Sequence, residues 1–456
     1  MEHKNPEKAI INEIRERNPW WAAGVVEFKE LVIERSIFKE ILKLVEERET
    51  ICLTGLRRVG KTTLMLQLVD HLVNCGVPPK RILYFSFDKP VFQNRDAIDG
   101  VISFYLENIL KETLIGPGEK IYVFFDEIQK VNNWSEEIKN IYDKTRKIKF
   151  IISGSSALNI LSGSGESLVG RIFVKKVFPF TFREYLKTDN VNMNLNINYI
   201  PASISYKEMK TLYQEVMLNE DKIKLKFNDY ADLGGFPEIL LSKNKELAIE
   251  RARSWIYFTL FKDIVDVFKI KRPDVLENLL IYISTTSGQT ANYAKMASRL
   301  NVKYDTVKKY LYYLDQTFLI NTSRYFSKSA KKIEKNEKIY TSDHGILNLF
   351  WHVEEGLKIE TMVSNFSRVV RYMREGDERI SYWREKEEVD IVLEINEEII
   401  PIEVKYQNKI ARRDIKGIIT FMEKFKIKKG IVVTKDLFKE EGDILFIPAW
   451  LFVLSV

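Results

Sequence analysis

The sequence predicts an α/β protein whose N-terminal part is built on a parallel, doubly wound sheet. Apolar runs at residues 50–54, 81–88 and 121–127 predict buried strands, and segments with helical periodicity lie between them. A fourth run, residues 149–156, ends in Ser153-Gly154-Ser155-Ser156. The carboxyl ends of parallel strands meet at one edge of the sheet, so the polar residues that end these strands should gather there.

The loop after the first strand, residues 55–62, fits the pattern G-x-x-x-x-G-K-[ST] at every fixed position. An apolar helical pattern follows, so the motif has the strand–loop–helix setting that it requires. Its glycines let backbone N–H groups point at phosphate oxygens, and the helix N-terminus favours negative charge. We expect ATP to bind here, with Lys61 on the β- and γ-phosphates and Mg²⁺ on the Thr62 hydroxyl. The expected nucleotide contacts are Gly55, Arg57, Arg58, Val59, Gly60, Lys61, Thr62, Thr63 and Ser155.

Other residues predict the hydrolytic part of this site. Asp126 and Glu127 end a strand about 65 residues after the loop, where an aspartate holds Mg²⁺ and a glutamate polarises the attacking water. Ser155 and Ser156 are candidates to sense the γ-phosphate, although such residues are also ordinary in turns. Arg171 follows a loop rich in Gly and Ser. It contacts either the γ-phosphate, in cis or across a subunit interface, or a surface carboxylate.

Composition indicates a globular protein of several domains, because 456 residues are too many for one core. The net charge of +7 is compatible with nucleic acid but does not require it. Cys52 and Cys75 form no C-x-x-C pair, so neither a zinc site nor a disulfide framework is expected. The polar N-terminus is unlike a signal peptide. The apolar tail, residues 444–456, is too short to span a membrane and predicts a last core strand. We expect a cytoplasmic protein with no membrane partner.

Residues 272–326 predict a winged helix-turn-helix. An amphipathic helix over 273–284 precedes helices over 291–300 and 304–314 that flank a short turn, and we expect 318–320 and 322–326 to form the wing. A basic cluster downstream would neutralise DNA phosphates in a salt-dependent way. Lysine runs are also common on solvated faces, however, and winged helices also bind proteins. The cluster comprises Lys328, Lys331, Lys332, Lys335 and Lys338.

The last region carries charged residues in a pattern that suits metal-assisted phosphodiester hydrolysis. Residues 388–394 and 399–405 predict a hairpin that brings Asp390 towards Glu403 and Lys405. The carboxylates would bind Mg²⁺, and the lysine would orient or deprotonate water. The alternative is a fold kept for DNA binding or assembly. Neighbouring acids would repel a phosphodiester unless a metal neutralised them: Glu385, Glu387, Glu388 and Glu394.

Several motifs occur in order along almost the whole chain, and together they resemble the predicted AAA+ superfamily ATPases of archaea and bacteria that carry a nuclease-like C-terminal domain. The resemblance implies an AAA+-like P-loop NTPase sheet, a helical lid and a restriction-endonuclease-like domain with a D…(D/E)-x-K centre, in which Glu360 would complete the metal site. Besides the phosphate loop, the resemblance rests on Phe125-Asp126-Glu127-Ile128-Gln129 with Trp134, Ser153-Gly154-Ser155-Ser156, Gly170-Arg171, Phe178-Pro179-Phe180-Thr181-Phe182-Arg183-Glu184-Tyr185 and Gly234-Gly235-Phe236-Pro237-Glu238.

We therefore expect an ATPase that remodels, translocates on or processes duplex or branched DNA, to which the last region could add Mg²⁺-dependent cleavage. The alternative is a signal-transducing ATPase switch that acts through protein partners and has a non-catalytic nuclease-like domain. Either protein is compatible with a homo-oligomer. No feature supports a transporter or a metabolic kinase. The expected regions are 1–186, the N-terminal helices and the ATPase domain; 187–271, a helical lid with an irregular insertion; 272–326, the winged helix; and 327–456, the nuclease-like domain.

Overall fold

The computed structural model describes residues 6–27, 33–93, 96–116, 118–154, 168–188, 204–265, 268–328 and 337–455. The chain forms two compact units, Met1–Val177 and Phe178–Val456. The three regions expected after residue 186 therefore lie within one unit.

The first unit contains a five-stranded sheet in which all the strands are parallel, in the order β2-β3-β4-β1-β5. This arrangement confirms the predicted parallel α/β sheet. Because the strands are parallel, the loop after β1 and the acidic end of β3 lie at the same edge of the sheet. Only β4 separates these two strands. The strands are β1 (Thr50–Thr54), β2 (Ile82–Ser86), β3 (Ile121–Asp126), β4 (Ile148–Gly154) and β5 (Ile172–Lys176).

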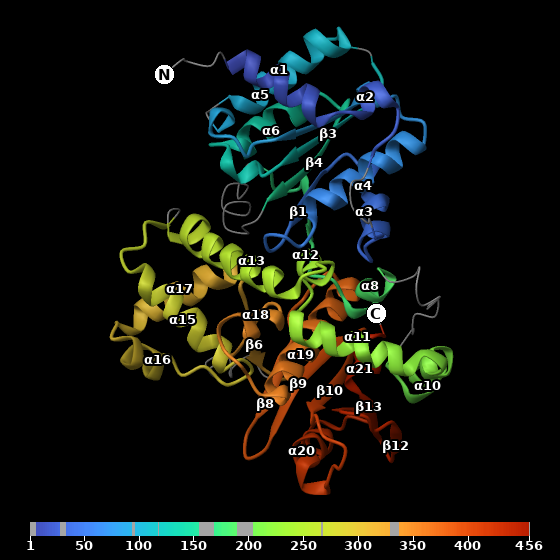
Figure 1. Ribbon diagram of the computed structural model, residues 1–456, viewed down its shortest axis with the longest axis vertical. Helices are drawn as coiled ribbons and strands as arrows, with labels where there is room; N and C mark the ends of the chain where they lie inside the picture. Colours follow the sequence, from blue (N-terminus) through green and yellow to red (C-terminus); the bar gives the residue numbers. More distant parts are fainter. Residues whose placement is uncertain are drawn as a thin grey trace. The chain divides into compact units, whose positions relative to one another are not determined.

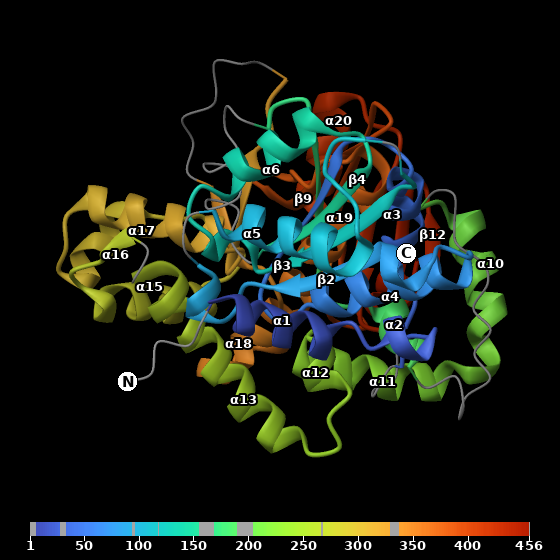
Figure 2. The same cartoon turned by 90° about the horizontal axis from the view of Figure 1, so that it is seen from above.

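Helices cover both faces of this sheet, with α5 and α6 on one face and α3 and α4 on the other (Figure 1). The view from above shows the same layers around β2, β3 and β4 (Figure 2). Side chains such as Phe85, Phe125 and Phe150 pack beneath α5 and α6. The helices are α1 (Pro6–Arg17), α2 (Trp20–Ala23), α3 (Phe38–Val45), α4 (Lys61–Asn74), α5 (Ala97–Phe104), which continues as a π-helical segment (Tyr105–Leu110), and α6 (Trp134–Lys144).

The second unit is built on an eight-stranded mixed sheet in the order β12-β13-β11-β10-β9-β8-β6-β7. Helices α19 and α20 both pack on its central strands β9 and β10. Phe421 of α20 lies in a core with Trp383 and Val432 of the sheet. The strands are β6 (Ile320–Tyr325), β7 (Lys338–Thr341), β8 (Ser381–Arg384), β9 (Glu388–Ile395), β10 (Glu398–Val404), β11 (Gly430–Thr434), β12 (Lys439–Glu441) and β13 (Ile444–Pro448).

Most of the described chain between residue 178 and β6 is helical. No helix among the described residues of either unit has the length and apolar character needed to cross a membrane. The helices are α8 (Phe182–Lys187), α10 (Tyr206–Val216), α11 (Glu220–Leu233), α12 (Pro237–Leu240), α13 (Lys245–Phe258), a π-helical segment (Thr259–Val265), α15 (Pro273–Thr285), α16 (Tyr293–Leu300), α17 (Tyr304–Gln316), α18 (Gly345–Phe350), α19 (Glu355–Glu375), α20 (Lys416–Phe425) and α21 (Ala449–Val453).

The strands expected for the wing differ from those in the structure. Residues 320–325 form a single strand, β6, whose antiparallel partner is β7, and β6 also pairs in parallel with β8. The hairpin therefore belongs to the large sheet, and the boundary expected after residue 326 falls within a continuous structure. The edge of a β-hairpin carries unpaired backbone groups that can pair with a further strand, and here β8 pairs with the edge of β6.

Two other expectations have mixed outcomes. The insertion at about 187–228 was expected to be partly irregular; residues 189–203 lie outside the described residues, and the part from residue 204 forms α10 and the beginning of α11. Ser205 caps α10 by accepting a hydrogen bond from the Glu208 N–H, and Met209 and Leu212 bury one face of that helix. The apolar tail begins as the expected core strand, β13, but the residues after Pro448 form helix α21. A short, fully buried apolar run has no polar face, so its period does not distinguish helix from strand.

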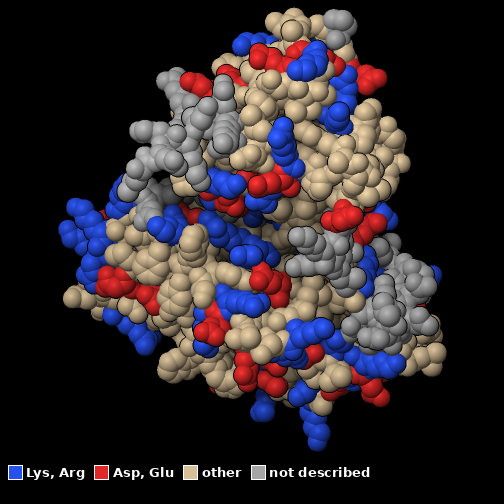
Figure 3. Space-filling model, turned by 45° about the horizontal axis from the view of Figure 1, so that its top comes forward, with Lys and Arg blue, Asp and Glu red and all other residues tan. Residues whose placement is uncertain are grey.

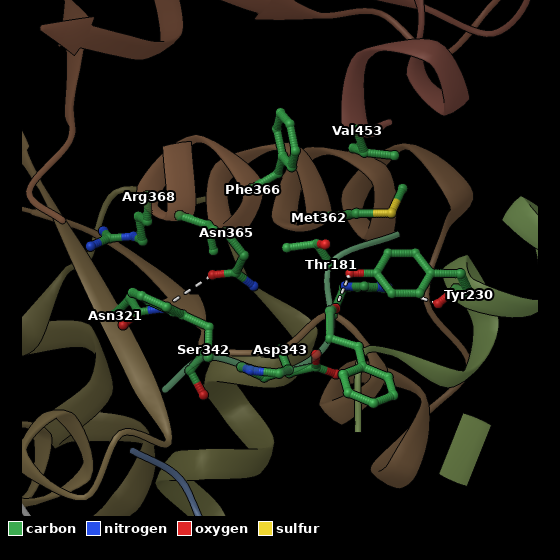
Figure 4. A pocket seen from close by; sticks show the side chains of 15 residues that line it. Thr181, Tyr230, Asn321, Ser342, Asp343, Met362, Asn365, Phe366, Arg368 and Val453 are labelled. Atoms are coloured by element: carbon green, nitrogen blue, oxygen red, sulfur yellow. Dashed lines mark hydrogen bonds between the residues drawn. The ribbon is translucent and has the colours of Figure 1, made fainter. Parts of the chain in front are cut away.

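The Gly234-Gly235 motif closes a joint within the second unit. The carboxylate of Asp343 accepts hydrogen bonds from the backbone N–H groups of Gly235 and Gly345, both at 2.8 Å. A Cβ at Gly234, whose φ is 80°, would lie 2.0 Å from Asp343 Oδ1, so glycine is required there. A cavity of ≈ 30 Å³ lies beside this joint, with Asn321, Asn365 and Asp343 in its lining (Figure 4). It has room for water but not for a nucleotide.

Candidate functional site

The phosphate loop joins β1 to α4 through backbone conformations that favour glycine. Gly55 has a φ of 145° and Gly60 a φ of 95°. A Cβ on Gly55 would lie 2.2 Å from the carbonyl oxygen of Val177, which follows β5. Both glycines of the motif are therefore required by the local backbone.

Lys61 and Thr62 occupy the first turn of α4. The Lys61 ammonium is buried and donates hydrogen bonds to the carbonyl oxygens of Gly55 and Leu56, both at 2.9 Å. The Thr62 hydroxyl donates to Asp126 Oδ2 at 2.6 Å. The loop and the end of β3, 64 residues apart in sequence, thus form one site, as the motif predicted.

The buried carboxylate of Asp126 is surrounded by donors that carry no charge. Besides Thr62, the Tyr84 hydroxyl donates to it at 2.8 Å, the Glu127 backbone N–H donates at 3.1 Å, and the Ser153 hydroxyl donates as well. Burial and the neighbouring carboxylate raise the pKa of Tyr84 well above its ordinary value, so the hydroxyl keeps its proton. These donors orient Asp126 without neutralising its charge.

The sequence predictions missed Tyr84 and Ser153. Tyr84 lies in the middle of β2 and Ser153 lies near the end of β4, and these two strands flank β3, so the parallel sheet brings both residues beside Asp126. Ser153 was within reach of prediction, because it belongs to the polar end of β4. Tyr84 gave no signal, since a tyrosine within an apolar strand is more often a core residue.

Glu127 and Arg35 also lie at this edge. Glu127 adopts a left-handed backbone, with φ at 56°, and its carboxylate accepts a hydrogen bond from Gln129 Nε2 at 2.6 Å. The buried guanidinium of Arg35 donates to the Val59 carbonyl in the phosphate loop at 2.7 Å. Arg35, another residue that the sequence gave no reason to select, therefore supports the loop from outside the motif.

The residues at this edge fit ATP with Mg²⁺. The Thr62 hydroxyl and the Asp126 carboxylate are oxygen ligands of the kind that Mg²⁺ prefers, and they lie within hydrogen-bonding distance of each other. Bound with its metal, ATP would supply the γ-phosphoryl group, and the metal would offset its negative charge. The chain would contribute Lys61 to the phosphates, Asp126 to the metal and Glu127 to the attacking water.

The remaining predicted contacts have different outcomes. Arg171 precedes β5 and forms an ion pair with Asp143 of α6, with Nε 3.0 Å from Oδ1. The surface carboxylate was one of its two expected partners. Ser155 and Ser156 lie outside the described residues. Arg57, Arg58 and Thr63 lie at the solvent-accessible surface of the loop and helix, where a nucleotide can reach them.

The second unit holds the predicted helix pair. Helices α16 and α17 pack against each other across the turn at 301–303, with α15 against both. The exposed residues of α17 include Tyr304, Lys308 and Tyr312, which are spaced by four and share one side of the helix. The Lys308 ammonium lies 5.0 Å from the centre of the Tyr304 ring. Basic side chains gather at the left edge of Figure 3, where these helices lie.

Lys338 corrects the expected basic cluster. It was expected to face DNA phosphates, but its side chain is 2% exposed and points into a group of carboxylates. All four residues of β7 are buried, so both faces of the strand are covered and Lys338 has no solvated side. Lys328 is exposed, and the other three lysines of the cluster lie outside the described residues.

The predicted hairpin of β9 and β10 is present and brings the expected residues together. Their ladder reaches the pair Ile391–Ile402, so Asp390 and Glu403 follow on adjacent strands. Asp390 Oδ2 accepts the Val404 N–H at 3.0 Å, and Lys405 Nζ donates to Glu403 Oε1 at 2.5 Å. Glu360 lies on α19, as expected.

Burial dominates the electrostatics of the carboxylate centre formed by Glu360, Asp390 and Glu403. It raises the pKa of Glu360 to about 7 and that of Glu403 to about 8, and the charge of Asp390 adds to both shifts. Burial lowers the pKa of Lys338, but the acidic groups that face it outweigh this effect and raise it well above its ordinary value. Lys338 therefore stays charged. Among the described residues, no group of three or more His, Cys, Asp or Glu is arranged to hold a metal ion.

The neighbouring acids are paired with basic residues. Glu385 contacts Lys424 at 2.5 Å, and Glu387 contacts Lys416 at 2.6 Å. Glu388 contacts Lys338 at 2.6 Å. The expected repulsion of a phosphodiester is therefore weaker at these three acids than their sequence positions suggest.

Comparison with known families supports the prediction of an ATPase domain in the first unit. Residues 47–186 match the family described as an AAA domain. Residues 224–357 and 355–452 match two families, each described as a domain of unknown function. With the five-stranded parallel sheet and the phosphate-loop geometry, the first match supports an AAA-type P-loop ATPase.

Similar proteins cover most of this chain. An uncharacterized protein of Methanocaldococcus jannaschii is 28% identical over 90% of this chain and 86% of its own length. An uncharacterized protein of Haemophilus influenzae is 22% identical over 93% of this chain and 99% of its own length.

Solved structures give weaker similarity. The Walker-type ATPase PABY2304 of Pyrococcus abyssi aligns with a TM-score of 0.41 and 15% identity, over 70% of this chain and 95% of its own. The Aeropyrum pernix ORC1 protein in complex with DNA aligns with a TM-score of 0.28 and 13% identity, over 73% and 96%. Similarity at these scores does not decide function.

Proposed function

We propose that the protein hydrolyses ATP in its first unit and binds DNA through the helix pair of its second unit, so that ATP turnover remodels, translocates on or processes the bound DNA. The arrangement of Lys61, Thr62, Asp126 and Glu127 at one sheet edge supports the ATPase part. The Mg²⁺ that accompanies ATP would bind at Thr62 and Asp126.

The exposed side of α17 is the observation that carries the DNA part. Tyr304 and Tyr312 are 44% and 50% exposed, so about half of each residue's surface is open to a partner. Lys308 lies between them, and the hydroxyl and ammonium groups can all donate to phosphate oxygens. Five basic residues of α16, α17 and their turn are exposed: Lys295, Arg299, Lys303, Lys308 and Lys309.

The test measures DNA affinity at several salt concentrations for the full chain and for Lys308→Ala/Lys309→Ala. Each lost phosphate contact should lower the salt slope by about 1, so the double variant should lose about 2. Lys207→Ala/Lys210→Ala is the matched control, because it removes the same charge from exposed positions on α10. An equal effect of both pairs would show that only net charge matters and would overturn the proposed helix-turn-helix contact.

Coupling is tested by ATP hydrolysis with duplex, single-stranded and four-way-junction DNA. Stimulation by DNA that disappears in Lys61→Ala supports an ATP-driven DNA-processing protein. No response to any DNA would refute the DNA part of the proposal. It would favour the alternative, a signal-transducing switch that acts through protein partners.

Arg171 allows a test of a homo-oligomer. Its ion pair with Asp143 must open if the guanidinium is to reach a γ-phosphate. If it acts across a subunit interface, mixing Lys61→Ala with Arg171→Ala should restore hydrolysis, since each protein supplies what the other lacks. If the mixture stays inactive, Arg171 does not act in trans.

A further inference from the structure

The ammonium of Lys338 lies among three carboxylates of the second unit. Its Nζ is 2.6 Å from Glu388 Oε1, 3.2 Å from Asp390 Oδ1 and 3.4 Å from Glu360 Oε1. A lysine ammonium has three N–H donors and no acceptor. Three carboxylates from α19 and β9 therefore match its full hydrogen-bonding capacity.

The backbone holds Lys338 in this position. It pairs with Ser323 at the end of the β6–β7 ladder and forms a bridge with Thr290 on its other side. The Tyr340 hydroxyl, from the same strand, donates to Glu360 Oε1 at 3.0 Å. Withdrawal of the side chain would leave the buried Asp390 and the partly buried Glu360 and Glu388 without their counter-charge, which is unfavourable.

These carboxylates include the residues that a nuclease-like centre would use for Mg²⁺. Mg²⁺ requires oxygen ligands at about 2.0–2.1 Å in octahedral geometry. Asp390 and Glu360 instead face an ammonium at hydrogen-bond distances, and Glu403 Oε1 faces Lys405 at 2.5 Å. Glu403 Oε2 is buried and has no hydrogen-bond partner among the described residues, but one such oxygen falls far short of an octahedral ligand set. The residues present do not fit a divalent metal.

We propose that Lys338 is the built-in cation of this centre, that it excludes divalent metal from Asp390, Glu360 and Glu403, and that the second unit is consequently not a metal-dependent nuclease. The centre is an ion cluster that ties β7 to α19 and β9. This inference does not depend on the proposed DNA binding.

The test counts Mn²⁺ ions bound to the full chain without nucleotide, by electron paramagnetic resonance of the free ion. Wild type and Asp390→Asn should bind the same number. Lys338→Met keeps the length of the side chain and removes its charge, so it should bind one additional Mn²⁺ per chain. That gain should disappear in Lys338→Met/Asp390→Asn. Thr62→Ala identifies any Mn²⁺ held at the phosphate loop.

Two metal-binding outcomes would overturn the inference. One is a Mn²⁺ ion that wild type binds and Asp390→Asn loses, since Lys338 would then give way to metal. This comparison needs no lysine variant, so it holds even if Lys338→Met fails to fold. The other is a folded Lys338→Met protein that gains no Mn²⁺, because Lys338 would then not be the excluding group. Cleavage of labelled DNA that depends on Asp390 and Mn²⁺ would also contradict it.

Discussion

Tyr84→Phe tests whether the donors around Asp126 tune the metal at the ATP site. The change removes one hydroxyl, whose hydrogen bond to Asp126 Oδ2 measures 2.8 Å, and leaves the buried ring in place. A hydrogen bond to a charged group contributes about 1.5–3 kcal/mol. Asp126 keeps its bonds from Thr62, Ser153 and the Glu127 N–H, so we expect the lower end, about 1.5 kcal/mol.

Two measurements follow from that magnitude. For a unit of this size, about 1.5 kcal/mol lowers the Tm by about 3–6 °C. A residue that orients a metal ligand typically changes metal affinity by about 10–100-fold, so MgATP should bind about tenfold more weakly. ATP without Mg²⁺ should bind with unchanged affinity, because Tyr84 contacts the metal ligand rather than the phosphate loop. Thermal unfolding and titration with a fluorescent ATP analogue, each with and without Mg²⁺, measure these effects.

Tyr122→Phe is the matched control. Tyr122 is also buried on this sheet and donates to a carboxylate, Glu46 Oε1, at 3.0 Å. It lies near the start of β3, whereas Asp126 ends that strand. Its loss should lower the Tm without changing MgATP affinity. If Tyr84→Phe and Tyr122→Phe weaken MgATP equally, or neither does, the reasoning about Asp126 is wrong.

Three further predictions concern other parts of the chain. Glu127→Gln should slow ATP hydrolysis by about 10²–10⁴-fold while ATP binding persists, as single-turnover and binding assays would show, because it removes the base but not the phosphate contacts. Gly234→Ala should destabilise the protein by more than Gly376→Ala, as denaturant unfolding would show. Both glycines have a positive φ, but only at Gly234 would an added Cβ collide with a carboxylate and with backbone atoms. Glu403→Gln should flatten the pH dependence of stability. The pKa of Glu403 is raised from 4.5 to about 8, so between these pH values the folded state keeps a proton that the unfolded state has lost. The stability of the wild type therefore falls as the pH rises through that window, by up to about 1.4 kcal/mol per pH unit, and the variant should lack this slope. An equal flattening by Glu394→Gln, which changes an exposed acid of the neighbouring strand β9, would refute that assignment.

The first unit was largely predictable because its signals are local. The strand–loop–helix order around Lys61 fixes a parallel sheet, and parallel strands bring their carboxyl ends together, so the meeting of Thr62 with Asp126 follows from sequence order. The supporting residues were not predictable in the same way. Tyr84 acts through its place beside β3, which depends on strand order within the sheet rather than on spacing along the chain.

The second unit was predicted element by element but not as an assembly. The hairpin of β9 and β10 follows from alternation and a short turn, and α15–α17 follow from helical periodicity. Lys338 lies 52 residues before Asp390, in a stretch whose other lysines suggested a solvated basic surface. Its burial depends on β6 pairing with both β7 and β8, a long-range pairing that neither composition nor periodicity records.

The two carboxylate centres of this chain have opposite chemistry, and the difference lies in their donors. Asp126 accepts hydrogen bonds from hydroxyls and a backbone N–H, which orient it and leave its negative charge for a cation. Lys61 donates to the backbone carbonyls of Gly55 and Leu56, which hold its ammonium within the phosphate loop. Asp390 faces the ammonium of Lys338, so its charge is already balanced within the protein. A divalent metal is therefore expected at Asp126 and not at Asp390, even though both aspartates lie on strands beside acidic neighbours and read alike in the sequence.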